Sequence, residues 1–538
     1  MTGRWMLSLT AMSCIASAAA TSHPPDVDAV FADIKPNAPG CAVGVQRAGE
    51  LLYTKGYGAA DLQSHAAITP MKRFYIGSTT KQFTAAIAAM LIQQNVLSPG
   101  MSVRHYLPDM PVFMADVTID DLIHHTSGIR DYTALSELAG RDIATQSDDA
   151  IIAQAKHQLG LDFTPGTQFS YSSTNYVLLA RILERTSGLS LDQLLAARIF
   201  TPLGMTKTLL WTDLKHPPTG MARGYVPLED NGFKPLRFDA LARGGTGMVT
   251  TVGDLLRWEE TLQHASNPPW PTLRKQMLTK GKLRSGESIP YGYGIELETW
   301  HGAPVEQHGG SFEGWKAQLL YLPHEDLTVA LLCNDGGAKQ SMMARKVAQL
   351  FMPHETSHSQ QIRPQQTTSQ ESLYAGVYVS ANRRAMRVIQ FDDAHLRMLD
   401  ASSSGVLLDP VGTGYRTQGG AEIHFVRTGN GYDLVESMNH TRQAFLPLLA
   451  PARVNPLGYT GLFRSTELAA DFRFRAVADK LVLEHPAWGR VPLSTEGEDA
   501  YGAKGYLFLF ERNRTGQITT MRVTGGGLWM MVFKRQGE

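Results

Sequence analysis

Two residues whose side chains could do covalent chemistry, Ser78 and Lys81, stand three positions apart in the stretch IGSTTKQFTAAI. Apolar residues continue after them at helical spacing, so the stretch predicts a helix. Positions i and i+3 share one face of a helix, which would bring the hydroxyl beside the amine. A serine needs a base to take its proton, and a lysine becomes such a base when burial lowers its pKa. Free backbone N–H groups at the helix start could hold the negative charge that develops.

The same stretch also fits an ordinary helix start. Ser78 would then cap the helix, and Lys81 would point into solvent. Because Ser-x-x-Lys arises by chance in many long chains, the motif supports catalysis only if partners exist elsewhere.

A first partner lies in the stretch FSYSSTNY, residues 169–176. It follows the turn TPGT and precedes a helical run, so Tyr171 and Ser173 are predicted on a loop. From this loop Tyr171 could relay a proton together with Lys81. The alternative is an aromatic residue that packs beneath a loop.

A second partner is His308, in the stretch EQHGGSFEGW, residues 306–315. Gly309 and Gly310 follow it, and the strand-like run KAQLLYLP comes next. Glycines at this place would let a substrate backbone lie close to the strand. The alternative is a tight turn with an incidental histidine.

These candidates fall in a block of about residues 25–350 that mixes strands and helices. Strand-like runs such as CAVGVQRAGELLYTKGYG and LTVALLCND lie at its two ends, and helical runs such as GDLLRWEETL fill the middle. That order predicts an α+β domain whose terminal strands share one antiparallel sheet.

The rest of the chain has a different composition and a different pattern of apolar residues. A polar segment at 351–371 is rich in Gln, Ser and Thr and is typical of a linker. Short alternating strands follow, and a shift of 85 residues brings similar positions together without a gap, such as Tyr374 onto Tyr459 and Phe425 onto Phe510. The repeat predicts two small antiparallel β-barrels, at 372–447 and 457–536.

Together the three motifs resemble the serine β-lactamase and penicillin-binding-protein superfamily. The stretches TIDDLIHHTSGIRDY, ARIFTPLGMTKT, MARGY and GGTGMVTTVGDLLRW look like that superfamily's landmarks, in its order. The likeness covers about residues 25–350 and is strongest for the D-aminopeptidase branch. That branch has His-x-Gly in place of Lys-Thr-Gly and two β-barrel domains behind the catalytic one. The stretches STTKQFT, SGIRDYTALSELAG and YTGLFRSTELAADF are similar to it.

The resemblance implies a role for each candidate. Ser78 would be the acylated nucleophile and Lys81 its base, and Tyr171 would assist proton transfer to the leaving group. His308 would take the role of the third motif, as the histidine of His-x-Gly. The backbone N–H groups of Ser78 and Ser311 would form the oxyanion hole. The residues that would bind the oxyanion or the substrate are Ser311, Ser173, Gly309 and Gly310. No metal and no cofactor are expected.

Two departures from the family leave the substrate open. Ser173 stands where the family usually has asparagine, and serine cannot offer an amide's donor and acceptor together. Asn175 lies two residues later, at a different place on the expected loop. An aminopeptidase must also hold an ammonium group, but Arg243 in LARGGTGM has no acid nearby in sequence. Glu306 or Glu313 could serve instead.

The resemblance further implies that a loop of the last barrel reaches the active site. The matching stretch is EHPAWGRVPL, residues 484–493, where Trp488 would narrow the pocket. The alternative is a plain barrel hairpin.

Composition and the N-terminus bear on location and partners. The 50 basic and 50 acidic side chains cancel, so nothing favours nucleic-acid binding. Residues 1–20 have the layout of a secretory signal, which predicts a periplasmic or secreted protein, and no later run is long enough to span a membrane. Cys14 falls in that signal. Cys41 and Cys333 lie in strand-like runs and could pair or remain two buried thiols.

Two other motifs would indicate different chemistry, and the sequence does not support either. HETSH, residues 354–358, fits the zinc pattern His-Glu-x-x-His, but no apolar periodicity supports a helix there. Gly-x-Ser-x-Gly is absent, which disfavours the commonest esterase fold.

The sequence therefore predicts an exported serine hydrolase that acts on a small peptide, amide or ester, with amides or peptides of D-amino acids as the first choice. The alternatives are a carboxylesterase, a penicillin-binding protein or β-lactamase, and a catalytically weak protein that binds the cell wall. The oligomeric state stays open.

Overall fold

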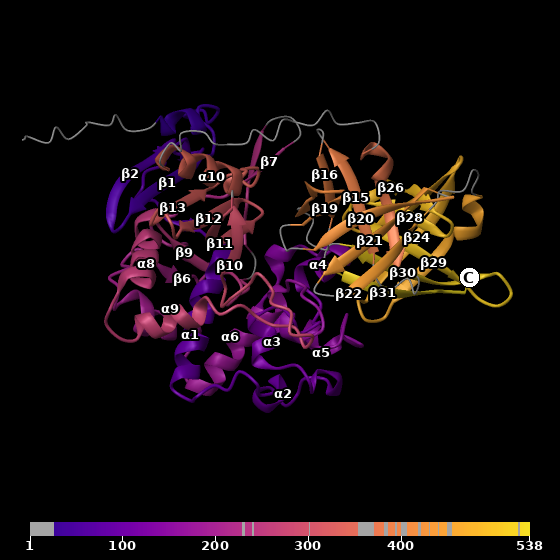
Figure 1. Cartoon of the computed structure of the whole chain (residues 1–538), viewed down its shortest axis with the longest axis horizontal. Helices are drawn as coiled ribbons and strands as arrows, with labels where there is room; N and C mark the ends of the chain where they lie inside the picture. Colours follow the sequence, from indigo (N-terminus) through magenta and orange to yellow (C-terminus); the bar gives the residue numbers. More distant parts are fainter. Residues whose placement is uncertain are drawn as a thin grey trace, which may run out of the picture.

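The computed structural model describes residues 26–537 apart from short gaps. The gaps are residues 229–231, 239–240, 301, 353–370, 381–385, 393–394, 400–405, 418–420, 430, 439–440, 449–454 and 526–527. The predicted secretory signal, most of the predicted linker and the HETSH stretch lie outside the described residues. Figure 1 shows an N-terminal body, coloured indigo to salmon, on one side and two β units, coloured orange to yellow, on the other.

A six-stranded antiparallel sheet forms the centre of the N-terminal body. Its strands lie in the order β10 (Glu296–Trp300), β11 (Ala303–Phe312), β12 (Trp315–Leu322), β13 (Leu327–Cys333), β1 (Cys41–Arg47) and β2 (Glu50–Tyr57). Strands β1 and β13 come from opposite ends of the block and pair along their whole length. The prediction of an α+β domain with shared terminal strands is confirmed.

Helices cover both faces of this sheet. Helix α8 (Val252–His264) contacts β1 and β13, while α10 (Gln340–Phe351) contacts β12 and β13 with the short turn η1 (Val27–Phe31) beside it. Along β13, Ala330 and Leu332 belong to the apolar cluster on the α8 side, whereas Val329 and Leu331 belong to the one on the α10 side. Because both faces are buried, the strand is apolar at almost every position.

Helical segments fill the middle of the block, as predicted. Helix α1 (Thr80–Gln93) is buried over most of its length, because α6 (Ser173–Ser187), α7 (Leu191–Leu195) and α9 (Trp270–Met277) pack around it. The remaining helices are α2 (Val103–Tyr106), α3 (Ile119–Ile123), α4 (Tyr132–Leu138) and α5 (Asp148–His157). Shorter turns are η2 (Gly77–Thr79), η3 (Val112–Met114), η4 (Ile143–Thr145) and the π-helical η5 (Ala196–Phe200).

Three small sheets complete the N-terminal body. They pair β3 (Ala59–Asp61) with β4 (Ala66–Ala67), β7 (Tyr225–Pro227) with β8 (Phe233–Pro235), and β9 (Met248–Thr250) with both β5 (Phe74–Tyr75) and β6 (Leu209–Leu210). Strand β5 matters for the site, because it ends three residues before Ser78.

Two nine-stranded antiparallel sheets follow, with the strand orders β17-β16-β15-β14-β22-β21-β20-β19-β18 and β26-β25-β24-β23-β31-β30-β29-β28-β27. The first, after the turn η6 (Glu371–Tyr374), has β14 (Gly376–Ser380), β15 (Met386–Asp392), β16 (His395–Leu399), β17 (Val406–Leu407), β18 (Asp409–Val411), β19 (Gly414–Arg416), β20 (Glu422–Thr428), β21 (Gly431–Met438) and β22 (Thr441–Pro447). The second, after the turn η7 (Pro456–Tyr459), has β23 (Gly461–Ser465), β24 (Ala470–Val477), β25 (Lys480–His485), β26 (Gly489–Pro492), β27 (Ser494–Gly497), β28 (Ala500–Ala503), β29 (Tyr506–Arg512), β30 (Ile518–Gly525) and β31 (Leu528–Arg535).

The two sheets repeat one topology. Strand β14 begins and ends 85 residues before β23, which is the shift found in the sequence. In each sheet the two edge strands are consecutive in the chain, so the sheet curls into a near-barrel. The predicted repeat thus corresponds to two β units with the same strand order.

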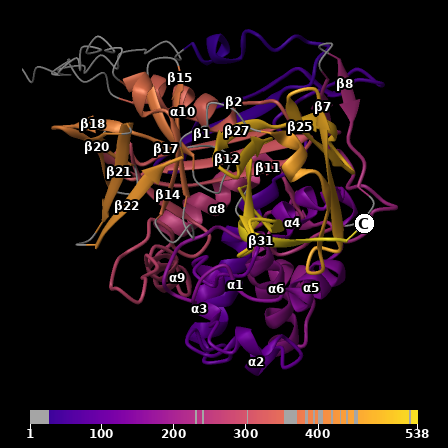
Figure 2. The ribbon, with the colours of Figure 1, turned by 90° about the vertical axis from the view of Figure 1, so that its right-hand side faces the viewer.

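The second β unit, β23 to β31, packs against α4 of the N-terminal body. Leu135 and Leu138 share an apolar cluster with Phe463 and Leu468. Helix α4 lies between the N-terminal body and the β units in Figure 1 and beside β31 in Figure 2. The β unit therefore touches the helical part of the body, close to the loop that precedes α4.

Candidate active site

Ser78 lies in the turn η2 between β5 and α1. Its side chain caps no helix, because neither η2 nor α1 has a side-chain cap hydrogen bond at its start. The alternative interpretation of Ser78 as a cap is therefore wrong. The turn lies against β11, where a Cβ on Gly310 would stand 1.9 Å from the carbonyl oxygen of Ile76.

The lack of a side chain at Gly310 is needed for packing inside the protein, and a role of Gly309 and Gly310 in binding substrate stays a prediction. The missing side chain of Gly310 makes room for the carbonyl oxygen of Ile76 in the Ser78 turn. Gly309 faces the opposite side of the sheet, toward Gln318. Gly77 completes the close approach, because it has φ +50° and a Cβ there would lie 2.8 Å from the backbone nitrogen of Ser311. The turn and the strand thus hold Ser78 and Ser311 close together.

Lys81 is fully buried on the first turn of α1. Its Nζ lies 3.1 Å from Ser78 Oγ, 3.0 Å from the carbonyl oxygen of Gly245 and 3.4 Å from Ser173 Oγ. Burial lowers its pKa to about 7, against a smaller opposing effect of the charges on Asp131 and Glu296. A lysine pointing into solvent is excluded, and an amine poised to lose its proton near neutral pH stands beside the serine.

Tyr171 comes from the loop before α6, as predicted. Lys81 Nζ lies 4.8 Å from the centre of its ring. Its hydroxyl oxygen is buried and has no hydrogen-bond partner of good geometry among the described residues. Burial raises the pKa of this phenol well above its usual value, and a weaker interaction with the Ser78 side chain opposes the rise. The hydroxyl is thus protonated, near Ser78 and free to bond to a reacting group.

His125 lies in the landmark stretch TIDDLIHHTSGIRDY, but the sequence did not indicate that it packs on Tyr171. Its ring lies 4.2 Å from that of Tyr171, and its Nδ1 accepts a hydrogen bond from the backbone N–H of Ser172 at 3.1 Å. Burial lowers its pKa well below the usual value, so the ring is neutral. Its φ of +59° is rare for a residue with a side chain. This uncommon backbone conformation at a buried histidine was the signal that only the structure could provide.

His308 lies inside β11, not beside a strand as the sequence suggested. Its Nδ1 bonds to the carbonyl oxygen of Gly309 at 2.6 Å, and its Nε2 lies 3.0 Å from the hydroxyl of Tyr291. Since a carbonyl only accepts, Nδ1 carries the proton and Nε2 accepts from Tyr291. Burial and the nearby charge of Lys81 lower the pKa of His308 to about 3. The His-x-Gly motif therefore offers a neutral imidazole at His308.

Ser173, which stands where the family usually has asparagine, and Asn175, two residues later, take different places. Ser173 begins α6, and its backbone N–H donates to Asp131 while its Oγ faces Lys81. Asn175 lies within the helix, fully buried, and its Oδ1 accepts from Ser127 Oγ at 2.8 Å. It is thus engaged in the protein interior and does not replace the missing asparagine.

Ser311 lies exposed near the open end of β11. Its Oγ accepts a hydrogen bond from Lys316 Nζ at 2.5 Å. Only the first half of β11 pairs with β10, because the register ends at Gln307 opposite Glu296. The edge from His308 to Phe312 is left unpaired on that side of the sheet.

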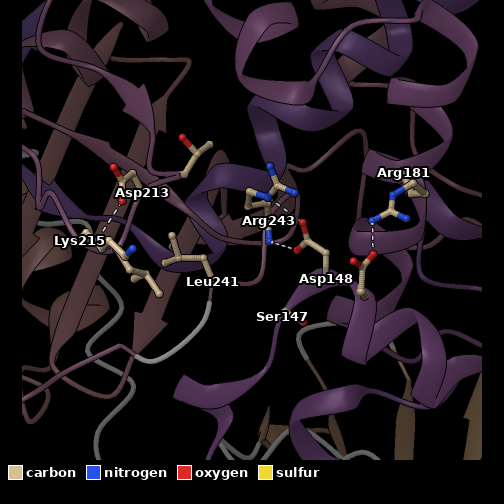
Figure 3. A pocket seen from close by; sticks show the side chains of 10 residues that line it. Ser147, Asp148, Arg181, Asp213, Lys215, Leu241 and Arg243 are labelled. Atoms are coloured by element: carbon tan, nitrogen blue, oxygen red, sulfur yellow. Dashed lines mark hydrogen bonds and ion pairs between the residues drawn. The ribbon is translucent and has the colours of Figure 1, made fainter.

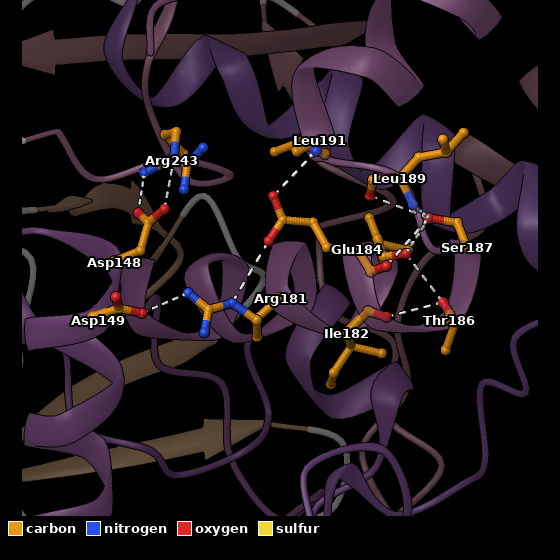
Figure 4. Close-up of polar contacts among 11 residues, drawn as sticks. Asp148, Asp149, Arg181, Ile182, Glu184, Thr186, Ser187, Leu189, Leu191 and Arg243 are labelled. Carbon is orange, nitrogen blue, oxygen red and sulfur yellow. Dashed lines mark hydrogen bonds and ion pairs between the residues drawn. The ribbon is translucent and has the colours of Figure 1, made fainter. Parts of the chain in front are cut away.

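Arg243 has no acid near it in the sequence, but the fold brings Asp148 against it. Its backbone nitrogen and its Nε both donate to the carboxylate of Asp148 at 2.6 Å, from a helix 95 residues earlier in the chain. These residues line a cavity of about 390 Å³ together with Ser147, Asp149, Arg181, Thr212, Asp213, Leu214, Lys215 and Leu241 (Figure 3). Arg181 likewise bonds to Asp149 and Glu184 (Figure 4). Both arginines that line this cavity are thus paired with carboxylates.

The two carboxylates considered for an ammonium group differ. Glu306 is engaged, because it accepts from Gln263 at 2.9 Å and pairs with Arg274 at 3.4 Å. Glu313 lies in the turn between β11 and β12, and its pKa is raised by partial burial of the carboxyl and by the charge of Asp142. Of these two carboxylates, Glu313 is the one that lies near the open end of β11.

The residues just before Trp488 contact the N-terminal body. The Trp488 ring stacks on His485 at 3.8 Å, and His485 Nε2 lies 3.0 Å from the carbonyl oxygen of Leu138. Pro486 and Ala487 lie against Gly140. The stretch from 484 to 493 therefore meets the end of α4, and a role for Trp488 in narrowing the pocket stays a prediction.

Two features are not found in the described part of the chain. No group of three or more His, Cys, Asp or Glu residues there is arranged to hold a metal ion. No helix there is long and apolar enough to cross a membrane.

The fold and the relatives identify the class of protein. Residues 27–351 match the Beta-lactamase family, and the chain belongs to that family. A penicillin-binding protein homologue from Pyrococcus abyssi, whose structure is described as octameric, shares the fold, with a TM-score of 0.55, 20% identity and coverage of 85% of this chain and 96% of that one. The protein is thus a serine hydrolase of the β-lactamase and penicillin-binding-protein superfamily.

Two curated relatives narrow the comparison. A D-aminopeptidase of Gluconobacter oxydans (strain 621H) is 29% identical over 63% of this chain and 63% of its own length. A D-aminopeptidase of Brucella anthropi is 28% identical over 91% of this chain and 94% of its own length. The aligned part spans less than two thirds of the first relative and nearly all of the second.

Proposed function

We propose that this protein is an exported serine hydrolase that forms an acyl-enzyme on Ser78 and hydrolyses amides or peptides of D-amino acids. The proposal rests on the 3.1 Å distance between Ser78 Oγ and Lys81 Nζ, with the lysine fully buried and its pKa lowered to about 7. A lysine in this state is partly neutral at neutral pH and can accept the serine proton.

The reaction follows from the positions of four side chains and two backbone N–H groups. Neutral Lys81 takes the proton of Ser78 as Oγ attacks the substrate carbonyl, and the backbone N–H groups of Ser78 and Ser311 hold the oxyanion. The proton on Lys81 passes through the Tyr171 hydroxyl to the leaving amine, and the carbon–nitrogen bond breaks. Water then attacks the acyl-enzyme along the reverse route and releases the acid. His308 bonds to the substrate as a neutral group beside Tyr171.

The pKa values give a test of this assignment. We expect kcat/KM for p-nitrophenyl acetate to fall about tenfold for each pH unit below about 7, because protonated Lys81 cannot act as a base. His308, with a pKa of about 3, and Tyr171, with a raised pKa, hold one protonation state from pH 5 to pH 9. Because p-nitrophenyl acetate has no amine, the substrate itself does not change its charge over this range. A profile that stays flat across this range would contradict the role of Lys81.

The choice of substrate is supported by the relatives and by His308 in the His-x-Gly motif. Both relatives reported above are D-aminopeptidases. A neutral His308 cannot pair with a carboxylate as the lysine of Lys-Thr-Gly can, so the site is poorer for penicillins, which carry one. These two facts favour aminoacyl amides over β-lactams.

A panel of four substrates tests the function. Wild-type protein is expected to hydrolyse D-alanine p-nitroanilide faster than its L form, to hydrolyse a short nitrophenyl ester, and to react slowly with a penicillin. The Ser78→Ala variant should turn over none of them. Stable labelling of Ser78 by penicillin without turnover would indicate a penicillin-binding protein, and no reaction with any compound would indicate a binding protein.

Carboxylester hydrolysis is the second candidate. Ser173 in place of asparagine and the internal bond of Asn175 leave the site with less recognition of a substrate amide than the family usually has. An ester needs less of that recognition. A faster reaction with the nitrophenyl ester than with either anilide, by more than their chemical reactivity explains, would favour this candidate.

Export is proposed from the predicted signal at residues 1–20 and is supported by a disulfide. Cys41 and Cys333 are bonded to each other across β1 and β13. Disulfides persist in oxidising compartments such as the periplasm. The location proposed is therefore periplasmic or secreted.

Removal of this disulfide should destabilise the protein. The Cys41→Ser, Cys333→Ser variant is expected to lose about 2–5 kcal/mol of unfolding free energy, because the bond closes a loop of 292 residues in the unfolded chain. Thermal unfolding of both proteins without reductant measures the loss. Native wild-type protein should show no reactive thiol from these two positions, and a full complement of free thiols would contradict the pairing.

A further inference from the structure

The turn between β23 and β24 binds the N-terminal body through two arginines. Glu467 Oε1 accepts from Arg130 Nη1 at 2.7 Å, and the carbonyl oxygen of Leu468 accepts from Arg141 Nη2 at 2.8 Å. The side chain of Leu468 is buried in the same apolar cluster as Leu135 of α4. This turn of the second β unit is therefore fixed to the body by polar and apolar contacts together.

Arg130 is buried between two carboxylates. Its Nε lies 2.9 Å from Asp162 Oδ1, and its Nη1 also donates to the carbonyl oxygen of Gly160 at 2.6 Å. The side chains of Arg130 and Glu467 are each 10% exposed and that of Asp162 is 3% exposed. A buried guanidinium needs its full set of acceptors, so loss of Glu467 would leave Arg130 partly unmatched.

The backbone around Arg130 holds the start of α6. The carbonyl oxygen of Arg130 accepts from Thr174 Oγ1 at 2.9 Å, and the backbone N–H of Tyr132 donates to the same Oγ1 at 2.8 Å. Between them, the carboxylate of Asp131 accepts from the backbone N–H of Ser173. Three consecutive residues thus hold the two residues that begin α6, and Ser173 Oγ lies 3.4 Å from Lys81 Nζ.

We propose that Glu467 is a positioning residue for catalysis. Through Arg130 it fixes residues 130–132, which fix the start of α6 and the loop of Tyr171 against Lys81. The second β unit thereby sets the geometry of the proton relay without touching the substrate. This inference rests on the proposed function, because it assigns Lys81 and Tyr171 to the reaction. A displacement of about 1 Å in such a site can cost about 100-fold in rate.

Three variants of the full chain test the inference. Glu467→Ala removes the carboxylate, and Glu467→Gln keeps an oxygen that can accept from Arg130. Asp471→Ala is the matched control, because Asp471 pairs with Arg464 inside the same hairpin at 2.7 Å and both side chains are exposed. The measurements are kcat and KM on D-alanine p-nitroanilide and on p-nitrophenyl acetate, together with the thermal midpoint.

We expect Glu467→Ala to lose about 10- to 100-fold in kcat on both substrates. Its KM should change little, because Glu467 does not touch the substrate. Glu467→Gln should restore most of the activity, and Asp471→Ala should stay within about twofold of wild type. To separate position from stability, rates are taken well below the thermal midpoint of each variant and expressed per folded molecule.

Two results would overturn the inference. One is a Glu467→Ala variant with kcat equal to that of Asp471→Ala. The other is a loss of activity that matches the unfolded fraction, which would make the contact purely structural. A wild-type protein that turns over neither substrate would contradict the proposed function and the inference together, whereas an active wild type with an insensitive Glu467→Ala variant would contradict the inference alone.

Discussion

The Ser78→Ala variant is expected to lose about four to six orders of magnitude in kcat while its stability stays unchanged. The nucleophile is removed, and the turn η2 loses no cap, since the Ser78 side chain makes no cap hydrogen bond at the start of η2 or α1. A capping serine would show the reverse result, with activity kept and about 1 kcal/mol of unfolding free energy lost. Steady-state kinetics and chemical denaturation of the same preparation measure both quantities.

Thr118→Ala is the matched control for this variant. Thr118 is a true cap, because its Oγ1 accepts from the backbone N–H of Asp121 at 3.1 Å and the Asp121 carboxylate bonds back to it. We expect this variant to lose about 1 kcal/mol of stability and to keep its activity. If Ser78→Ala behaved like Thr118→Ala, Ser78 would be structural.

The Lys81→Met variant has the second largest expected effect. Methionine is similar in length and apolar, so it can fill the buried space beside Tyr171 but cannot accept the serine proton. We expect kcat/KM to fall by about three orders of magnitude or more. Lys81→Arg should fall as far, because a guanidinium keeps the charge but does not lose its proton. An active arginine variant would show that Lys81 supplies only charge.

The Lys81→Met variant is also expected to change the stability of the protein. Burial of Lys81 lowers its pKa to about 7 in the folded protein, below the 10.5 of the free side chain. Burying the charged form costs free energy in full below about pH 7, and this cost falls as the pH rises toward 10.5. Relative to wild type, Lys81→Met should therefore gain more unfolding free energy at pH 6 than at pH 9. Denaturation at both pH values checks the sign.

The sequence predicted local features well because they depend on near neighbours. The spacing of Ser78 and Lys81 and the turn before Tyr171 can be read within a few residues. The repeat of 85 residues was visible because both β units keep the same strand order, and the shared sheet of β1 and β13 followed from the order of strands and helices. The boundaries of the predicted domains, by contrast, stay a prediction.

Other parts of the site could not be predicted because they join residues far apart in the chain. Asp148 meets Arg243 across 95 residues, and Glu467 meets Arg130 across 337. Gly310 is needed because β11 approaches the Ser78 turn so closely, and His125 packs on Tyr171 with a backbone conformation that is rare for a residue with a side chain. No spacing rule encodes such contacts, which arise only when the sheet and the helices pack.

Acylation of Ser78 can be observed by mass spectrometry of the intact protein. Wild-type protein mixed with p-nitrophenyl acetate near pH 8, where Lys81 is neutral, and then quenched with acid to stop deacylation should gain the mass of one acetyl group. Peptide mapping should place that group on Ser78, and the Ser78→Ala variant should gain none. Acetylation at another residue, or rapid turnover by Ser78→Ala, would contradict the account.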